Sequence, residues 1–219
     1  KSACPRPDDY MKSFEGADNI IVVTITGTLS GSYNSAEIAK KIYLEEHPDT
    51  KIHVIDSLSA GGEVDLIVRK LNHLVTEGLD FEQVVDGITV YQAKTKLLFV
   101  LAKVDNLVKN GRLSKLIGTV VGLLNIRMVG EASKTGTLEL LQKARGQKKA
   151  IKAAFDELIK AGYTGGNITI AHRNNEKFIE QFSAMIREKF AQASIEVLPT
   201  SGLCSFYAEE GGLLMGYEI

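Results

Sequence analysis

The sequence predicts an α/β protein of two domains, in which a mainly parallel sheet with flanking helices is followed by an α+β domain. Two apolar, β-branched segments, residues 19–25 and 51–56, each lead into a loop of small residues and then into a helical pattern. This alternation is typical of βαβ units and parallel strands. After Asp105 the pattern changes to a hairpin signal and mixed elements, so the predicted domains are residues 1–105 and 106–219.

The elements of the first predicted domain follow from hydrophobic spacing. Continuous apolar runs with β-branched residues indicate buried strands, and apolar residues three or four positions apart indicate helices. The expected strands are residues 19–25, 51–56 and 97–101, and the expected helices are a short one from residue 10 and those at 35–43, 64–77 and 81–93.

The second predicted domain contains shorter elements. Lys134-Thr135-Gly136 lies between two strand-like runs, which is a hairpin signal. A helix interrupted at Gly111 is expected at residues 104–115, followed by an apolar, glycine-containing stretch at 117–124. The other expected strands are residues 127–131, 137–141, 167–172, 195–198 and 213–217, and the other expected helices are 148–160 and 175–191.

Composition narrows the class of protein. The chain has 219 residues, of which 44% are hydrophobic and 24% charged, and a net charge of −1. Such a chain can bury a sizeable core, and its charge balance gives no reason to expect nucleic-acid binding. No apolar run reaches the roughly 18 residues of a membrane span, and the first ten residues lack the apolar core of a signal peptide. We therefore expect a soluble, cytoplasmic protein with no stable membrane insertion.

Cysteine and histidine usage adds two expectations. Cys4 and Cys204 lie at opposite ends of the chain, and we expect free thiols in a reducing cytoplasm. The four histidines lack zinc-ligand spacing, so no metal site and no cofactor are expected. The chain starts on Lys1 with prolines close behind, which suggests an absent N-terminal segment.

The loop Thr26-Gly27-Thr28-Leu29-Ser30-Gly31-Ser32 follows the first expected strand and is the main candidate site. Its hydroxyls and the free N–H groups of the next helix would suit an anion, and its glycines let a ligand approach the backbone. The candidate contacts are Gly27, Thr28, Ser30 and Gly31. The loop matches neither a Walker A nor a GxSxG motif. It can equally be a capped turn with Ser32 or Asn34 as the N-cap, and local chemistry leaves both interpretations open.

A small serine hydrolase is the alternative from a different functional class. Ser30 would be the nucleophile and His172, at the end of an expected strand, the base. No local pattern places the two side chains together, and a histidine at a strand end is more often structural.

Two arginines next to glycines form a further candidate set. Arg112 lies in Gly111-Arg112-Leu113-Ser114-Lys115 and Arg145 in Lys143-Ala144-Arg145-Gly146. Arginine suits bidentate recognition of phosphate or carboxylate. Taken alone, these residues are more simply interpreted as solvated helix ends, and no aromatic residues interleave with them as in nucleic-acid sites.

Six motifs in order make the chain resemble the DegV family of bacterial fatty-acid-binding proteins. They span nearly the whole chain and are residues 2–7, 27–36, 54–57, 111–115, 123–126 and 143–146. The resemblance implies two α/β domains with a long-chain fatty acid between them. Its carboxylate would be held by Ser2 and Ser30, with no other cofactor.

The resemblance also implies a partner. Some members present the bound acid to a separate kinase, which makes acyl phosphate, so the chain would be a non-catalytic subunit. Arg112 and Arg145 would then lie near the carboxylate, where phosphate arrives or the kinase docks. Two departures concern this role: Phe206 stands where the family often has a His, and the loop after Ser57 continues as Gly61-Gly62-Glu63. The family normally has a further N-terminal segment.

Overall fold

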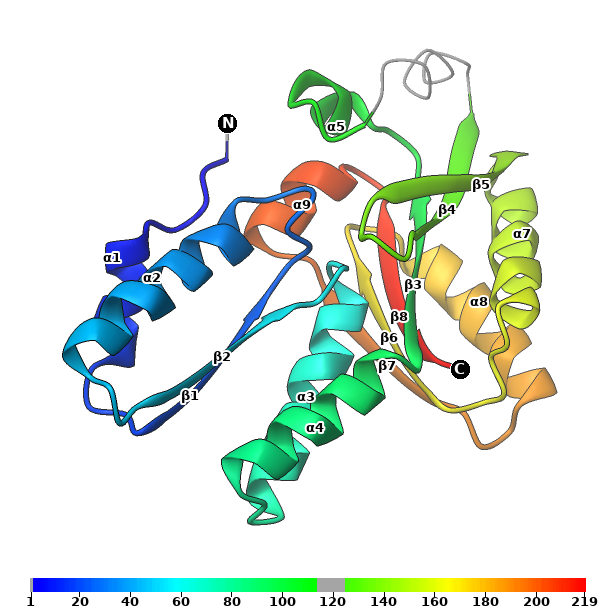
Figure 1. Cartoon of the computed structure of the whole chain (residues 1–219). Coiled ribbons are helices and arrows are strands. Elements are labelled where there is room, and N and C mark those ends of the chain that lie inside the picture. Colours follow the sequence, from blue (N-terminus) through cyan, green and yellow to red (C-terminus); the bar gives the residue numbers. More distant parts are fainter. Residues whose placement is uncertain (1, 114–124) are drawn as a thin grey trace.

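The computed structural model describes residues 2–113 and 125–219, which form two sheets with helices packed on their faces (Figure 1). The smaller sheet pairs β1 (Asn19–Thr24) with β2 (Lys51–Asp56) in parallel. Its β-branched run packs on both faces, as predicted. Ile20 and Val22 point to one hydrophobic cluster and Ile21 and Val23 to another.

Helices cover both faces of this smaller sheet. On one side lie α1 (Pro7–Phe14) and α2 (Ser32–Glu46), and on the other α3 (Gly62–Thr76) and α4 (Phe81–Gln92). Asp80 caps α4 by accepting a hydrogen bond from the Gln83 backbone N–H at 2.9 Å. Because β1 and β2 run parallel, the loops that follow them leave the same edge of the sheet, as the βαβ pattern predicts.

The larger sheet has the strand order β5-β4-β3-β8-β6-β7. Its neighbours are antiparallel except for the parallel pair β6–β7. The strands are β3 (Thr95–Leu101), β4 (Ile126–Ala132), β5 (Leu138–Arg145), β6 (Asn167–His172), β7 (Ser194–Pro199) and β8 (Leu213–Glu218). Helices α7 (Gln147–Lys160) and α8 (Glu176–Lys189) pack on one face, and α3, α5 (Asp105–Lys109) and α9 (Gly202–Ala208) lie towards the other (Figure 1).

The α/β class is confirmed, but one strand lies in the other sheet. Residues 97–101 were expected in the parallel sheet, whereas β3 pairs antiparallel with β4 and β8 in the larger one. Leu98 and Val100 face one core cluster and Phe99 and Leu101 the other. An apolar run shows that a strand is buried but not which strand it pairs with. The change of sheet thus precedes the predicted boundary near Asp105, and the division into two domains stays a prediction.

The other predicted elements are mostly where expected. The hairpin between β4 and β5 is confirmed: the Ser133 N–H donates to the Thr137 carbonyl at 2.8 Å. The helix expected at residues 104–115 is shorter, because α5 ends at Lys109 and Gly111 has a φ of 71°. The sequence did not predict α9, and the apolar stretch at 117–124 lies outside the described residues.

Candidate functional site

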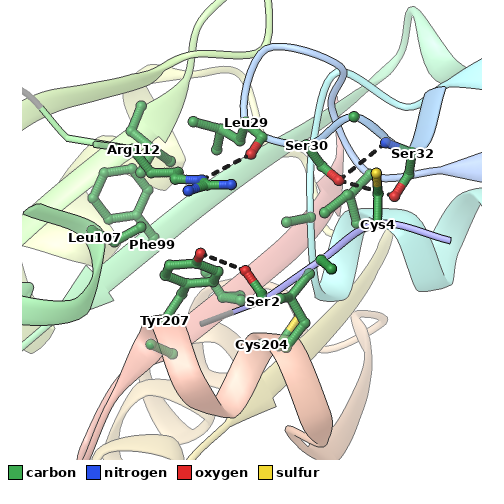
Figure 2. A pocket seen from close by; sticks show the side chains of 18 of the residues that line it. Ser2, Cys4, Leu29, Ser30, Ser32, Phe99, Leu107, Arg112, Cys204 and Tyr207 are labelled. Atoms are coloured by element: carbon green, nitrogen blue, oxygen red, sulfur yellow. Dashed lines mark hydrogen bonds between the residues drawn. The ribbon is translucent and has the colours of Figure 1, made fainter. Parts of the chain in front are cut away.

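A cavity of about 470 Å³ lies between the two sheets, at the edge where β1 and β2 end (Figure 2). This volume is within the range of small-molecule sites. Its walls come from four places: the N-terminal residues, the loops after β1 and β2, the face of the larger sheet opposite α7 and α8, and the α5 and α9 region. The lining residues are Ser2, Ala3, Cys4, Pro5, Ile25, Leu29, Ser30, Gly31, Ser32, Ala60, Phe99, Leu101, Leu107, Arg112, Leu138, Leu203, Cys204, Tyr207, Ala208 and Leu214.

The loop after β1 brings Ser30 to the cavity. The Ser30 N–H donates to the Thr26 carbonyl at 3.2 Å, which closes a tight turn. The Ser30 Oγ accepts the Ser32 backbone N–H at 3.2 Å and lies 2.9 Å from the Ser32 Oγ. Ser30 thus both orders the start of α2 and places a hydroxyl in the cavity wall, so the capped-turn and ligand-site interpretations are compatible.

The helix start itself differs from the prediction. Ser32 or Asn34 was the expected N-cap, but Gly31 holds that position and α2 begins at Ser32. The first turn therefore begins at the cavity, with Gly31 and Ser32 in its wall. The Ser32 N–H already donates to the Ser30 Oγ, and the helix dipole at this end favours a negatively charged ligand group.

The N-terminal residues meet α9 across the cavity. Ser2 Oγ lies 2.8 Å from the Tyr207 hydroxyl, and either can be the donor. Both cysteines line the cavity and are free, as predicted. Burial raises the pKa of the Cys204 thiol, so the neutral thiol adds to the apolar lining.

Arg112 supplies positive charge to the same end. Its Nε donates to the Leu29 carbonyl at 3.2 Å and its Nη1 to the Asn110 carbonyl at 2.6 Å. The guanidinium carbon is 5.9 Å from the centre of the Tyr207 ring. Figure 2 shows Arg112, Ser30, Ser2 and Tyr207 around the same space, with Phe99 and Leu107 beside Arg112. The cavity wall therefore includes hydroxyl groups and a guanidinium.

The rest of the lining is apolar. Phe99 and Leu101 of β3, Leu138 of β5 and Leu214 of β8 present side chains from the larger sheet, and Leu107 comes from α5. A small apolar pocket adjoins this wall and shares Phe99, Leu101 and Leu138 with it. The combination suits an amphipathic ligand with one anionic end and a long hydrocarbon part.

Two predicted contacts, Gly27 and Thr28, lie outside the cavity lining. The Gly27 N–H donates to both carboxylate oxygens of Asp56, at 3.1 and 3.2 Å. The Thr28 hydroxyl donates to the Gly136 carbonyl in the β4–β5 hairpin at 2.7 Å. In this structure both residues support the loop, whereas Ser2, Ser30, Gly31 and Arg112 line the cavity together.

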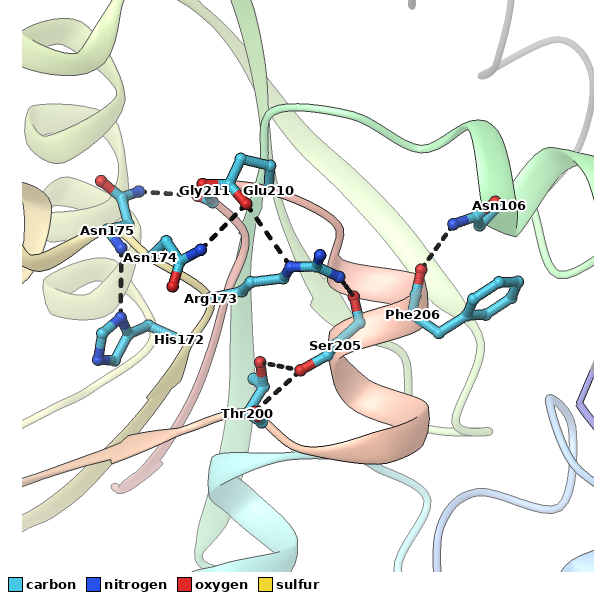
Figure 3. Close-up of polar contacts among 10 residues, drawn as sticks. All are labelled: Asn106, His172, Arg173, Asn174, Asn175, Thr200, Ser205, Phe206, Glu210 and Gly211. Carbon is cyan, nitrogen blue, oxygen red and sulfur yellow. Dashed lines mark hydrogen bonds and ion pairs between the residues drawn. The ribbon is translucent and has the colours of Figure 1, made fainter.

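Arg145 and His172 lie elsewhere. Arg145 is exposed at the end of β5, opposite Ile126 in β4, and does not line the cavity. His172 ends β6, and its Nδ1 accepts the Asn175 backbone N–H at 3.3 Å (Figure 3). The described hydrogen bonds of the Ser30 side chain go to Ser32, so His172 is not placed to activate Ser30.

Phe206 lies on α9 and is also outside the cavity lining. Its carbonyl accepts a hydrogen bond from Asn106 Nδ2 at 2.8 Å (Figure 3). The next residue, Tyr207, faces the cavity instead, and sequence reasoning missed it. The available signal was position, because Tyr207 directly follows Phe206, which stands where the family often has a His.

No group of three or more metal-binding side chains gathers in residues 2–113 and 125–219. Within the same ranges, the helices are too short or too polar for a membrane span.

Comparisons with known proteins place the chain in a family. The model of the DegV family, described as an uncharacterised protein family, matches residues 1–217. A DegV domain-containing protein of Streptococcus pneumoniae is 78% identical over 219 residues, which are all of this chain and 78% of the relative.

Several solved structures are similar along nearly the whole chain, among them two with a bound fatty acid. The Fatty Acid Kinase (Fak) B3 protein of Streptococcus pneumoniae, loaded with linoleic acid, is 78% identical with a TM-score of 0.97, covering 99% of this chain and 77% of that one. A DegV family protein of Eubacterium eligens loaded with heptadecanoic acid is 40% identical with a TM-score of 0.95, covering 100% and 79%. The chain belongs to the DegV family.

Proposed function

We propose that this chain binds a long-chain fatty acid in the cavity between its two sheets. The carboxylate would contact Ser30 and Ser2, with Arg112 supplying the counter-charge. The hydrocarbon chain would lie along Phe99 and Leu138. The observation that carries the proposal is the cavity itself, which has hydroxyls and a guanidinium at one end and apolar side chains along the rest.

The energetics favour holding such a ligand. Each buried methylene contributes about 0.8 kcal/mol, so a long acyl chain supplies most of the affinity. The carboxylate must exchange its water for protein donors, and charge-assisted bonds from Arg112 and the serine hydroxyls would offset that loss. Relatives support the ligand class, since similar structures are described as loaded with linoleic and heptadecanoic acid.

We further propose that the chain is a non-catalytic subunit that presents its ligand to a separate kinase in the cytoplasm. The similarity to a protein named as part of a fatty acid kinase supports this role. Arg145 is exposed, so it could contact a partner, whereas Arg112 is close to the proposed carboxylate position. Phe206 does not line the cavity, but its ring packs edge-on against Tyr207, which does.

The ligand proposal is tested by extracting the purified protein and identifying bound acids by mass spectrometry. We expect long-chain fatty acids in the wild type and much less in Ser30→Ala. The matched control is Ser13→Ala, because Ser13 is exposed on α1 and its hydroxyl donates to the Tyr10 carbonyl away from the cavity. If neither extraction nor addition of oleic acid gives a bound acid in the wild type, the proposal is wrong.

The kinase proposal needs a separate experiment. We expect co-purification with a kinase to weaken in Arg145→Ala while the amount of bound acid stays at the wild-type level. A kinase complex that survives the replacement of both Arg112 and Arg145 would contradict the docking role of these residues.

A further inference from the structure

We propose that Thr28 and Thr26 form a latch with the β4–β5 hairpin, and that this latch positions Ser30 and slows release of the bound acid. The inference rests on the proposed function. It gives Thr28 a positioning role in place of direct ligand contact. The latch is defined as the hydroxyls of Thr26 and Thr28 together with the carbonyl of Gly136.

The three oxygens lie within hydrogen-bonding distance of one another. The Thr28 Oγ1 is 2.7 Å from the Gly136 carbonyl and the Thr26 Oγ1 is 3.0 Å from it, while the two hydroxyls are 2.9 Å apart. Two hydroxyls carry two protons, so only two of the three contacts can be hydrogen bonds at one time. The shortest distance assigns the Thr28 proton to Gly136. The Thr26 proton then goes to Gly136 or Thr28.

The latch joins segments more than one hundred residues apart. Thr26 and Thr28 follow β1 of the smaller sheet, whereas Gly136 connects two strands of the larger sheet. The cavity lies between these sheets. Leu29 directly follows Thr28, and Leu138 is two residues after Gly136, and both line the cavity. Breaking the latch therefore frees two opposing parts of the wall, including the loop that carries Ser30.

Hydrogen bonds within the hairpin tip hold the Gly136 carbonyl in place. Ser133 bonds to Thr135 and Thr137 within the tip, and the Gly136 N–H donates back to the Ser133 carbonyl at 2.9 Å. Gly136 has a φ of 78°, a backbone conformation that glycine adopts readily. A Cβ at this position would lie only 2.1 Å from the Thr26 Oγ1. Glycine is thus needed both for the turn and for the approach of Thr26.

The test measures the rate at which each variant releases a fluorescent long-chain fatty acid after mixing with excess oleic acid. Thr28→Val removes the donor and keeps the shape. Because Thr28 is exposed, the substitution opens no core cavity, and folding is checked by thermal unfolding. We expect release to be about three- to tenfold faster, a range that matches the loss of one hydrogen bond. Thr28→Ser restores the hydroxyl and should release at nearly the wild-type rate.

The control is Thr135→Val, because the Thr135 hydroxyl bonds within the hairpin tip and not to the Ser30 loop. It should leave the release rate unchanged. Gly136→Ala keeps both hydroxyls but forces them away from the carbonyl, so it should also accelerate release. Release at the wild-type rate from both Thr28→Val and Gly136→Ala, or equally fast release from Thr28→Ser, would overturn the latch. A wild type that binds no acid would instead overturn the proposed function.

Discussion

Arg112 is held by backbone carbonyls, and this determines how it can act on a ligand. Its Nε and Nη1 donate to the carbonyls of Leu29 and Asn110, and the guanidinium lies over Tyr207. Carbonyls orient the guanidinium but carry no formal charge to neutralise it. The positive charge is therefore fixed in place at the cavity, where it can attract a carboxylate.

Replacing Arg112 by Gln should weaken binding of a fatty acid about tenfold or more, because hydrogen bonds to charged groups contribute about 1.5–3 kcal/mol. Binding of the fatty alcohol of the same chain length should change much less. Competition with a fluorescent acid measures both affinities. Equal losses for acid and alcohol would show that Arg112 acts through packing and not through its charge.

Glu63 predicts a pH dependence of stability. The side chain is 5% exposed and accepts a hydrogen bond from Thr95 at 2.8 Å, and its burial raises the pKa of the carboxyl above the ordinary 4.5. Between the unfolded and the raised folded pKa, the native state holds more protons than the unfolded state. The free energy of unfolding therefore falls as pH rises through this window. Below the window the carboxyl is protonated in both states, so Glu63 does not destabilise the fold by ionising.

We expect Glu63→Gln to lose this dependence. Urea unfolding of wild type and variant from pH 4 upwards should give a difference in unfolding free energy that shifts in favour of the variant as pH rises, and then levels off. A difference that stays constant, or that moves in favour of the wild type, would contradict the assignment.

The residues of the site were only partly predictable from sequence. Ser2, Ser30, Gly31 and Arg112 were predicted and line one cavity. Tyr207 was missed, because its role depends on the short helix α9 turning that hydroxyl towards Ser2, and no local pattern encodes this contact. Thr28 was predicted as a contact because a hydroxyl in a loop looks the same whether it faces a ligand or another strand.

At the scale of elements, α3 packs closely on the larger sheet through glycines. A Cβ on Gly216 would lie 2.2 Å from the Glu63 backbone nitrogen, and one on Gly62 would lie 2.2 Å from the Thr169 carbonyl. In the sequence, Gly61-Gly62-Glu63 stands out only as a departure from the family pattern. The structure shows that this loop starts the helix that joins the two sheets.

Gly216→Ala should therefore destabilise the protein by about 1–3 kcal/mol or more, because backbone atoms cannot yield to the added methyl group as a flexible side chain can. Gly87→Ala in α4 is the control. Its Cβ would meet the flexible Leu74 side chain at 3.1 Å, and alanine favours a helix. Thermal and urea unfolding measure both. A Gly216→Ala protein as stable as Gly87→Ala would contradict the close packing.

The strands themselves were predictable from sequence, whereas the pairing of one of them was not. Strand runs such as residues 167–172 and the β4–β5 hairpin were predicted from periodicity and turn residues, which are local properties. The pairing of β3 with β4 and β8 was not, because strand partners are chosen by contacts between distant segments. No local pattern in the sequence shows that β3, which follows the helices of the smaller sheet, joins the larger sheet.

At the scale of the whole molecule, the cavity exists only because the two sheets meet. The loops of the smaller sheet form its polar end with Ser2, Arg112 and Tyr207, and the larger sheet forms its apolar wall. A ligand that contacts both parts stabilises the folded chain, and this stabilisation grows with the logarithm of the ligand concentration relative to Kd. Binding and global stability are therefore linked.

The most direct test of this account is a crystal structure of the protein with oleic acid. We predict one elongated ligand between the sheets, with its carboxylate within hydrogen-bonding distance of the Ser30 and Ser2 hydroxyls and its hydrocarbon chain along Phe99 and Leu138. A carboxylate bound away from Ser30, a reversed ligand, or a cavity that stays empty at saturating oleic acid would contradict it.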